Sequence, residues 1–188
     1  KTLWSKTDMS NLRLINETEI TSSVASVSVT DIFTSDFDIY KIIFSGTDSD
    51  SINTYTYARF INSSGSIISA SNYDFANLNM RAWTSFAEQK GTNTNYLKYL
   101  MYQDNQTADG GGLTMYVFNP TNTSSYTFSL SQATAQNSSN GAESMKSIGV
   151  LKQTNNINGI VFYAIDSSAV AKNWEQGIVR TYGLRVDS

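Results

Sequence analysis

The sequence predicts an all-β fold, an antiparallel, jelly-roll-like sandwich of about eight to ten strands. Apolar and polar residues alternate with a period of two along much of the chain, which is typical of half-buried strands. Clusters of Gly, Asn, Asp and Ser interrupt the alternation at short intervals, as turns do. No series of helical segments separates the strand-like runs, so a parallel α/β arrangement is not expected. The 188 residues have the length of one domain.

The first strand-like runs differ in how apolar they are. Residues 25–29 alternate, so Ala25, Val27 and Val29 are expected on one face. Residues 40–44 are nearly all apolar, which indicates a central strand that ends at Gly46. Near the C-terminus, residues 178–186 predict the last strand.

Three pairs of alternating runs flank turn-like sequences, and each pair is predicted to form a hairpin. The pairs are residues 54–61 with 66–70, residues 113–118 with 126–130, and residues 147–154 with 160–165. In the third pair, Asn158-Gly159 has the residue types that a type I′ turn requires.

Three short segments permit other structures. Residues 80–89 have a rough helical spacing of apolar residues and residues 168–175 could form one helical turn, although both are too short to change the fold class. Residues 96–102 are compatible with a buried strand or a helical turn. Residues 1–21 lack clean alternation and are expected to form an N-terminal arm, followed by a single sandwich domain over residues 22–188.

The composition argues against most enzyme classes. The chain has no His and no Cys, so Ser–His–Asp and Cys–His catalytic arrangements and thiolate metal sites are excluded. We therefore expect a non-enzymatic protein without a cofactor or a structural metal. A pair of carboxylates, as in glycoside hydrolysis, is the alternative. The candidates are Asp74, Glu88, Asp104, Asp109, Glu143, Asp166 and Glu175, most of them in expected loops.

The charge and hydropathy of the chain argue against two classes of partner, nucleic acid and membrane. A net charge of −3 gives no basic footprint for nucleic acid. No apolar run approaches the roughly 20 residues that cross a bilayer, so no membrane partner is expected. Asp48 and Asp50 alternate in a hydroxyl-rich loop and could offer oxygens to calcium, but the EF-hand pattern is missing and a solvated turn is the simpler interpretation.

Aromatic residues near loops suggest a possible sugar-binding surface, because aromatic faces stack on pyranose rings. Tyr73, Trp83 and Trp174 are the residues we select for such a role. The other candidates are Tyr55, Tyr57, Tyr96, Tyr99, Tyr102 and Tyr116. The alternative is that tyrosines simply favour strands, with each hydroxyl at the water boundary.

Four segments in a fixed order carry a family resemblance. They are FDIYKIIFSG at 37–46, YARFI with NSSG and SNYDFA between 57 and 76, GLTMYVFNP at 112–120, and GIVRTYGLR at 177–185. In this order they resemble a group of tailed-phage virion proteins that form capsid-surface or tail-fibre domains and are common in marine phages. Thr181 departs from that group, which usually has an apolar residue there.

The resemblance implies a jelly-roll-like domain on the surface of a virion, bound to capsid or tail proteins and assembled as a homo-oligomer. It implies no catalytic residues. We therefore expect a structural protein that decorates the capsid or forms part of a fibre. The alternative is a carbohydrate-binding adhesin for host-surface glycans. Trp4, Leu12, Leu14 and Ile15 are the apolar residues expected to anchor the N-terminal arm to a partner.

Overall fold

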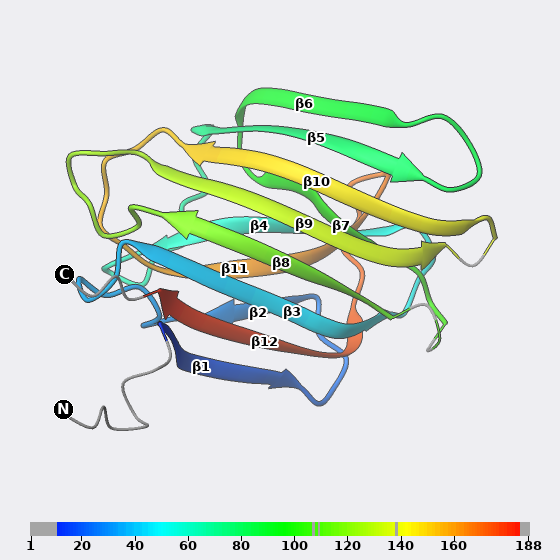
Figure 1. The fold of residues 1–188 in the computed structure, drawn as a ribbon, viewed down its shortest axis with the longest axis horizontal. Coiled ribbons are helices and arrows are strands. Elements are labelled where there is room, and N and C mark those ends of the chain that lie inside the picture. Colours follow the sequence, from blue (N-terminus) through cyan, green and yellow to red (C-terminus); the bar gives the residue numbers. More distant parts are fainter. Residues whose placement is uncertain (1–10, 107, 109, 138, 185–188) are drawn as a thin grey trace, which may run out of the picture.

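The chain folds as a sandwich of two antiparallel sheets. The computed structural model describes residues 11–184, except residues 107, 109 and 138. Within this part of the chain there are twelve strands, eight in one sheet and four in the other. The large sheet has the order β1-β12-β3-β8-β9-β10-β5-β6, and the small sheet has the order β2-β11-β4-β7. Figure 1 shows the large sheet in front of the small one.

The strands are short to medium in length, and most run across the full sandwich. They are β1 Leu12–Ile20, β2 Ser26–Val29, β3 Ile39–Ser49, β4 Thr54–Asn62, β5 Tyr73–Arg81, β6 Ala87–Thr94, β7 Leu97–Gln103, β8 Gly111–Phe118, β9 Thr127–Asn137, β10 Gly141–Leu151, β11 Ile157–Asp166 and β12 Trp174–Leu184.

Eight of these strands have the connectivity of a jelly roll. When β5, β6, β9 and β10 are set aside, the outermost strands of the chain pair with each other and the inner ones pair in turn. The four antiparallel pairs are β1 with β12, β2 with β11, β3 with β8, and β4 with β7. When the ribbon made of these four strand pairs is rolled up, β12 lies beside β3 and β11 lies beside β4. The result is two four-stranded sheets.

The other four strands extend one sheet only. The hairpin β5–β6 lies between β4 and β7 in the chain, and the hairpin β9–β10 lies between β8 and β11. Both join the large sheet beyond β8, where β9 pairs with β8 and β10 pairs with β5. The large sheet is therefore twice as wide as the small one, and β7 is the small-sheet strand nearest to the added half.

The core lies between the sheets and is aromatic. Trp174 and Phe44 pack edge to face with ring centroids 5.0 Å apart, and the centroid of the Phe162 ring lies 5.7 Å from that of Phe44. All three side chains are fully buried. Each large apolar side chain removed from water stabilises the fold by about 1.5–3 kcal/mol, so this cluster holds the two sheets together.

The predicted fold class is confirmed, and the strand count is higher than expected. The hairpin of β8 and β9 and the last strand are present. Residues 96–102 form most of β7, so the strand alternative is the correct one. The predicted helical segment at residues 80–89 is wrong, because those residues form the end of β5, a turn and the start of β6. Residues 168–175 form a turn and the start of β12 rather than a helix.

The predicted turn at Asn158-Gly159 is also wrong. Both residues lie inside β11, and β10 and β11 belong to different sheets. A Cβ atom on Gly159 would lie 2.4 Å from the backbone oxygen of Val29. This glycine is therefore required by the close approach of β2, and not by a positive φ.

The predicted hairpin at residues 54–70 is present only in its first part. The turn closes with Gly65 at a φ of 80°, but the return is limited to a bridge between Ile61 and Ile67. The chain then crosses to the large sheet and forms β5. Tyr73, at the start of β5, fixes this crossing because its hydroxyl donates to the Ile68 carbonyl and accepts from the Phe60 amide.

The described part of the predicted N-terminal arm belongs to the sandwich. Residues 12–20 form β1, an edge strand that pairs with β12 along its length. The expected boundary at residue 21 therefore falls after a strand of the large sheet. Residues 1–10 lie outside the described part of the chain.

Candidate functional site

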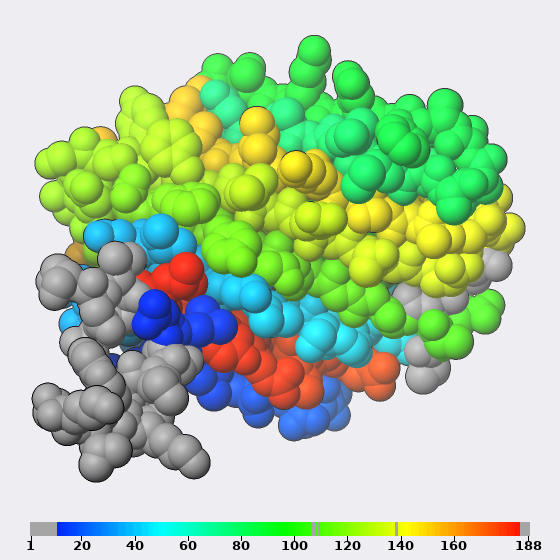
Figure 2. All heavy atoms as spheres, viewed as in Figure 1, coloured from blue at the N-terminus to red at the C-terminus, as the bar shows by residue number. Residues whose placement is uncertain are grey.

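The outer face of the large sheet has two neighbouring rows of mostly apolar side chains. The first row consists of directly paired residues from six adjacent strands, namely Leu12, Leu184, Ile39, Phe118, Phe128 and Val150. The second row crosses all eight strands and consists of Leu14, Tyr182, Lys41, Tyr116, Leu130, Ile148, Ala76 and Lys90. We call these two rows together the apolar band. Figure 2 shows the face on which it lies, with the strands following one another from β1 at the bottom to β6 at the top.

Several side chains of the apolar band are well exposed. Ile148 is 59% exposed, Leu14 50% and Phe128 44%. Single exposed apolar residues are ordinary on a soluble protein, but a contiguous apolar patch marks an interaction surface. The next row on the same face is mostly polar and includes an ion pair between Arg180 and Glu17, 2.6 Å apart. The apolar band therefore occupies one part of the face and has a polar border.

The first half of strand β9 is inverted relative to the usual pattern of a half-buried strand, whereas its second half buries Ala133 and Ala135 and exposes Gln132, Thr134 and Gln136. Its large apolar residues Phe128 and Leu130 are exposed, whereas Thr127, Ser129 and Ser131 are buried against the small sheet. A shift of register by one residue would bury Phe128 and Leu130, but it would also bury Gln132, Thr134 and Gln136. The observed register therefore leaves two large apolar side chains exposed in the first half of the strand.

The same inversion continues into the neighbouring strands. On β10, Ile148 is exposed and Ser147 is buried, and on β5, Asn77 and Asn79 are buried. Close packing of β7 explains the small inner residues, because a Cβ atom on Gly149 would lie 2.4 Å from Leu97 Cδ2. Small inner residues are thus confined to the stretch that β7 covers most closely, whereas Tyr73, Phe75, Met145 and Leu151 are buried elsewhere on the inner face of β5 and β10.

The apolar band is hollowed at its β8–β6 side. A groove of about 730 Å³ lies between the two rows, with Phe118, Phe128, Ile148 and Val150 among its lining residues. An adjoining hollow of about 420 Å³ is lined by Tyr116 and Leu130 together with Thr114, Gln132 and Lys146. Since Leu130 and Ile148 are direct cross-strand partners, the two hollows are neighbours.

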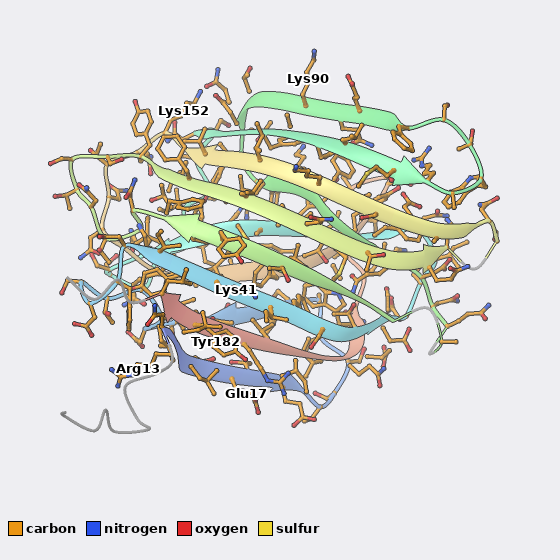
Figure 3. The ribbon with its side chains drawn as sticks, in the orientation of Figure 1. Arg13, Glu17, Lys41, Lys90, Lys152 and Tyr182 are labelled. Atoms are coloured by element: carbon orange, nitrogen blue, oxygen red, sulfur yellow. The ribbon has the colours of Figure 1, made fainter. Side chains whose placement is uncertain are left out.

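Lysines border this groove. Lys90 lines the groove itself, Lys146 lines the adjoining hollow, and the Lys41 ammonium lies 6.0 Å from the centroid of the Tyr116 ring. Across the described part of the chain, none of these three lysines forms an ion pair. Figure 3 shows Lys41 near the middle of the face and Lys90 at the β6 edge. The border of the groove is thus basic although the whole chain has a net charge of −3.

Asp74 is the acid at the β6 end of the groove, and it is already neutralised. Its carboxylate lies 2.9 Å from Lys152 Nζ and also accepts the Asn93 amide at 2.8 Å. The hydrogen bond from Lys152, followed by that from Asn93, lowers the pKa of Asp74 below its ordinary value. This ion pair leaves Lys90 as the charged residue without an ion pair among the described residues that line the groove.

The predicted anchoring residues divide between the outer face and the core. Leu12 and Leu14 belong to the apolar band at its β1 edge. Ile15 is partly buried and packs against the core. Trp4 lies outside the described residues. The pattern that selected Leu12 and Leu14 did not select Phe128, Leu130 or Ile148, because each of these alternates with polar residues as a core residue does.

Two of the three selected sugar-binding aromatics are in the core, which corrects that expectation. Tyr73 and Trp174 are fully buried. The Trp174 indole donates to Gln103 Oε1 at 2.7 Å, also inside the fold. Neither ring has a free face for a sugar. Trp83 is half-buried in the turn between β5 and β6, and its role stays a prediction.

Other tyrosines meet on and beside the small sheet. Six rings form a series of edge-to-face contacts with centroids 5.1–5.7 Å apart, in the order Tyr163, Tyr96, Tyr57, Tyr99, Tyr55 and Tyr102. The Arg59 guanidinium lies 3.6 Å from the Tyr96 centroid. Burial raises the pKa of Tyr57 and of Tyr55 above the ordinary value. We call these six residues the tyrosine cluster.

The described candidate acids do not all lie at the surface. Glu143 is on β10 and buried, where it accepts a hydrogen bond from Asn79 and lies 3.6 Å from Arg81 Nε. Asp104 is buried and accepts the Tyr102 hydroxyl at 3.2 Å. The expectation of solvated loop acids is wrong for these two. Asp166 pairs with Lys172 at 3.3 Å, and Glu175 accepts from Ser23.

The loop with Asp48 and Asp50 uses its carboxylates within the protein. Asp48 Oδ1 accepts the Ser49 amide, and Asp50 Oδ1 accepts the Asn173 amide at 3.1 Å. Among the described residues, no group of three or more acidic side chains is placed to hold a metal ion. No helix in the same part of the chain is long and apolar enough to cross a membrane.

Comparison of the chain with models of protein families, with curated proteins and with solved structures finds no match.

Proposed function

We propose that this chain is a non-enzymatic structural module that attaches to another protein through the apolar band. The observation that supports this most directly is the inversion of the first half of β9, which exposes Phe128 and Leu130 while Ser129 and Ser131 are buried. Full burial of such a side chain is worth about 1.5–3 kcal/mol, and Phe128 at 44% and Leu130 at 37% exposure forfeit part of it. A second protein on this face restores that burial.

The fold supports a place on a virus particle. Jelly rolls form viral capsid and lectin domains, and the chain has the four nested strand pairs of that topology. The four segments that resemble tailed-phage virion proteins include parts of β3, β8 and β12, three adjacent strands under the apolar band. We therefore propose a capsid-decorating or fibre protein that adheres to the particle by this face.

Site-specific photo-cross-linking in the native assembly tests this proposal. A photoreactive residue at Ile148 lies in the groove, and one at Ser28, exposed on β2 of the small sheet, is the matched control. We expect a protein adduct at residue 148 and none at residue 28. If residues 14, 128 and 148 all fail to form a protein adduct, attachment through the apolar band is wrong.

A glycan-binding module is the second candidate, and the tyrosine cluster is the observation that favours it. Tyr96 and Tyr163 are half-buried, and Arg59, Lys98 and Asp166 supply charged groups beside the cluster. The Arg59 guanidinium, however, already occupies the Tyr96 ring at 3.6 Å. A glycan array with the wild type and with Tyr96→Ala tests this candidate. Binding that Tyr96→Ala abolishes supports it, and a wild type that binds no glycan removes it.

A further inference from the structure

Two loops at one end of the sandwich form an exposed tip that is both apolar and acidic. Ile52 follows β3 and Val170 follows β11, and each is 53% exposed. The loops are joined, because Asp50 N donates to the Asn173 carbonyl at 3.0 Å and Asn173 N donates to Asp50 Oδ1. We call Ile52 and Val170, with the acids Asp48, Asp50 and Asp166, the acidic tip.

The charges of the acidic tip and of the groove are opposite. Of the three acids, only Asp166 forms an ion pair within the described residues, with Lys172. The groove has apolar walls and the free lysines Lys90 and Lys146 near its border. An apolar side chain flanked by carboxylates is therefore the kind of group that the groove accepts, since charge complementarity steers association and selects partners.

The acidic tip cannot reach the groove of its own chain. Strand β3 begins at Ile39, in the first row of the apolar band, and ends at Ser49 beside the tip after 11 residues. At about 3.3 Å per residue, the tip lies roughly 33 Å from that row. Figure 1 shows the β3–β4 and β11–β12 connections at the end of the sandwich opposite to the start of β3.

We propose that the occupant of the groove is the acidic tip of a second copy of this chain. Resting on the proposed function, this inference names its protein partner. The contact is heterologous, because a groove on one copy meets a different surface on the next. Such contacts do not close on a dimer, and they continue into a ring or a filament. The repeated contact gives the symmetric assembly that a particle-surface protein needs.

Sedimentation velocity of the full chain over a range of concentrations tests the proposal with two variants. Ile52→Lys places a cation in the tip, where it faces the lysines of the next copy. Ile148→Glu places an anion in the groove, where it faces the incoming acids. Each variant alone is expected to sediment as a monomer, whereas the wild type forms species larger than a dimer. Ile67→Lys, an exposed apolar position outside both surfaces, is expected to assemble as the wild type does.

Mixing the two variants distinguishes the geometries. The Ile52→Lys chain keeps an intact groove and the Ile148→Glu chain keeps an intact tip, so the mixture is expected to associate although neither variant does so alone. Face-to-face pairing through the apolar band predicts instead that Ile52→Lys assembles normally and that mixing restores nothing, and this result overturns the proposal. Lys90→Glu is expected to weaken assembly at least about tenfold through like-charge repulsion.

A wild type that stays monomeric at every concentration also overturns this inference. In that case an adduct from residue 148 to a different protein leaves the proposed function intact. Self-assembly through the groove and attachment through the apolar band can therefore be disproved independently of each other.

Discussion

Leu130 of β9 and Ile148 of β10 are direct cross-strand partners, and both side chains point to solvent. Directly opposed apolar side chains stabilise an antiparallel pair by contact with each other. Here the same pair also divides the groove from the adjoining hollow. The pair is thus placed at the centre of the surface that we propose for attachment.

Replacing Leu130 by Thr is expected to destabilise the isolated chain only slightly. Leu130 is 37% exposed and Thr favours strands, so the loss of the contact with Ile148 should lower the free energy of unfolding by less than about 1 kcal/mol. Ser131→Leu is the matched change on the buried side of the same strand, where Ser131 is 3% exposed. Overpacking there should destabilise the chain by about 1–3 kcal/mol. Urea unfolding of both variants measures the contrast, and an equal effect of the two would show that β9 is not inverted.

Gly159→Ala is expected to destabilise the chain by about 1–3 kcal/mol, because the new Cβ atom clashes with backbone that cannot move alone. The nearest atom, the Val29 oxygen, would lie only 2.4 Å away. Gly112→Ala is the control, since its Cβ would have its nearest neighbour at 3.5 Å. Thermal unfolding compares them. Equal melting temperatures for the two variants would contradict the close approach of β2 to β11.

Trp174→Phe is expected to reduce stability by at least about 2 kcal/mol, because it removes buried volume and the shorter of the two hydrogen bonds that a buried acceptor receives. The indole now donates to Gln103 Oε1 at 2.7 Å and packs against Phe44. Trp83→Phe, in a half-buried turn, should cost less than about 1 kcal/mol. Chemical denaturation measures both values, and a negligible effect at Trp174 would mean that it is not a core residue in solution.

The chain is expected to lose stability as the pH rises above about 10, the ordinary pKa of tyrosine. Burial raises the pKa of Tyr73, Tyr57 and Tyr102 in the folded state. Above pH 10 the unfolded chain therefore loses protons that the folded chain retains, and the free energy of unfolding falls with pH. This stabilising contribution is complete below pH 10 and is lost as the pH approaches the raised pKa values.

A spectroscopic titration measures this effect. Tyrosinate absorbance and circular dichroism are followed together, and the ionisation of the buried tyrosines is expected to coincide with loss of structure. In denaturant all tyrosines should titrate together near the ordinary pKa, which gives the reference. If every tyrosine ionises near pH 10 while the fold stays intact, the assigned burial is wrong.

Local patterns were sufficient for the elements whose partners are close in the chain. The β8–β9 hairpin follows from two alternating runs around Asn119-Pro120, and its pairing is observed. Val27 and Val29 share a buried face, as their alternation predicts. The turn predicted at Asn158-Gly159 is wrong because this dipeptide lies inside β11. There Gly159 permits the close approach of β2, a strand about 130 residues earlier in the chain. Such a contact leaves no local signature.

The candidate site could be predicted only in part. Leu12 and Leu14 were selected because their segment lacks clean alternation, and both lie on the apolar band. Phe128 and Ile148 were missed because the groove depends on the order of the strands, in which β9 and β10 lie between β8 and β5. Tyr73 and Trp174 were misplaced because an aromatic residue beside a loop can turn either inward or outward.

The sequence by itself determined that this protein is a β-sandwich, since period-two alternation and turn residues act locally and recur along the chain. Only the tertiary structure decided which side of each strand is buried. Alternation defines two faces and does not distinguish them, and in the first half of β9 the face toward the neighbouring β7 carries Ser129 and Ser131, while Phe128 and Leu130 lie on the other face. Packing between the sheets therefore turned the apolar residues outward and created the surface on which the proposed function depends.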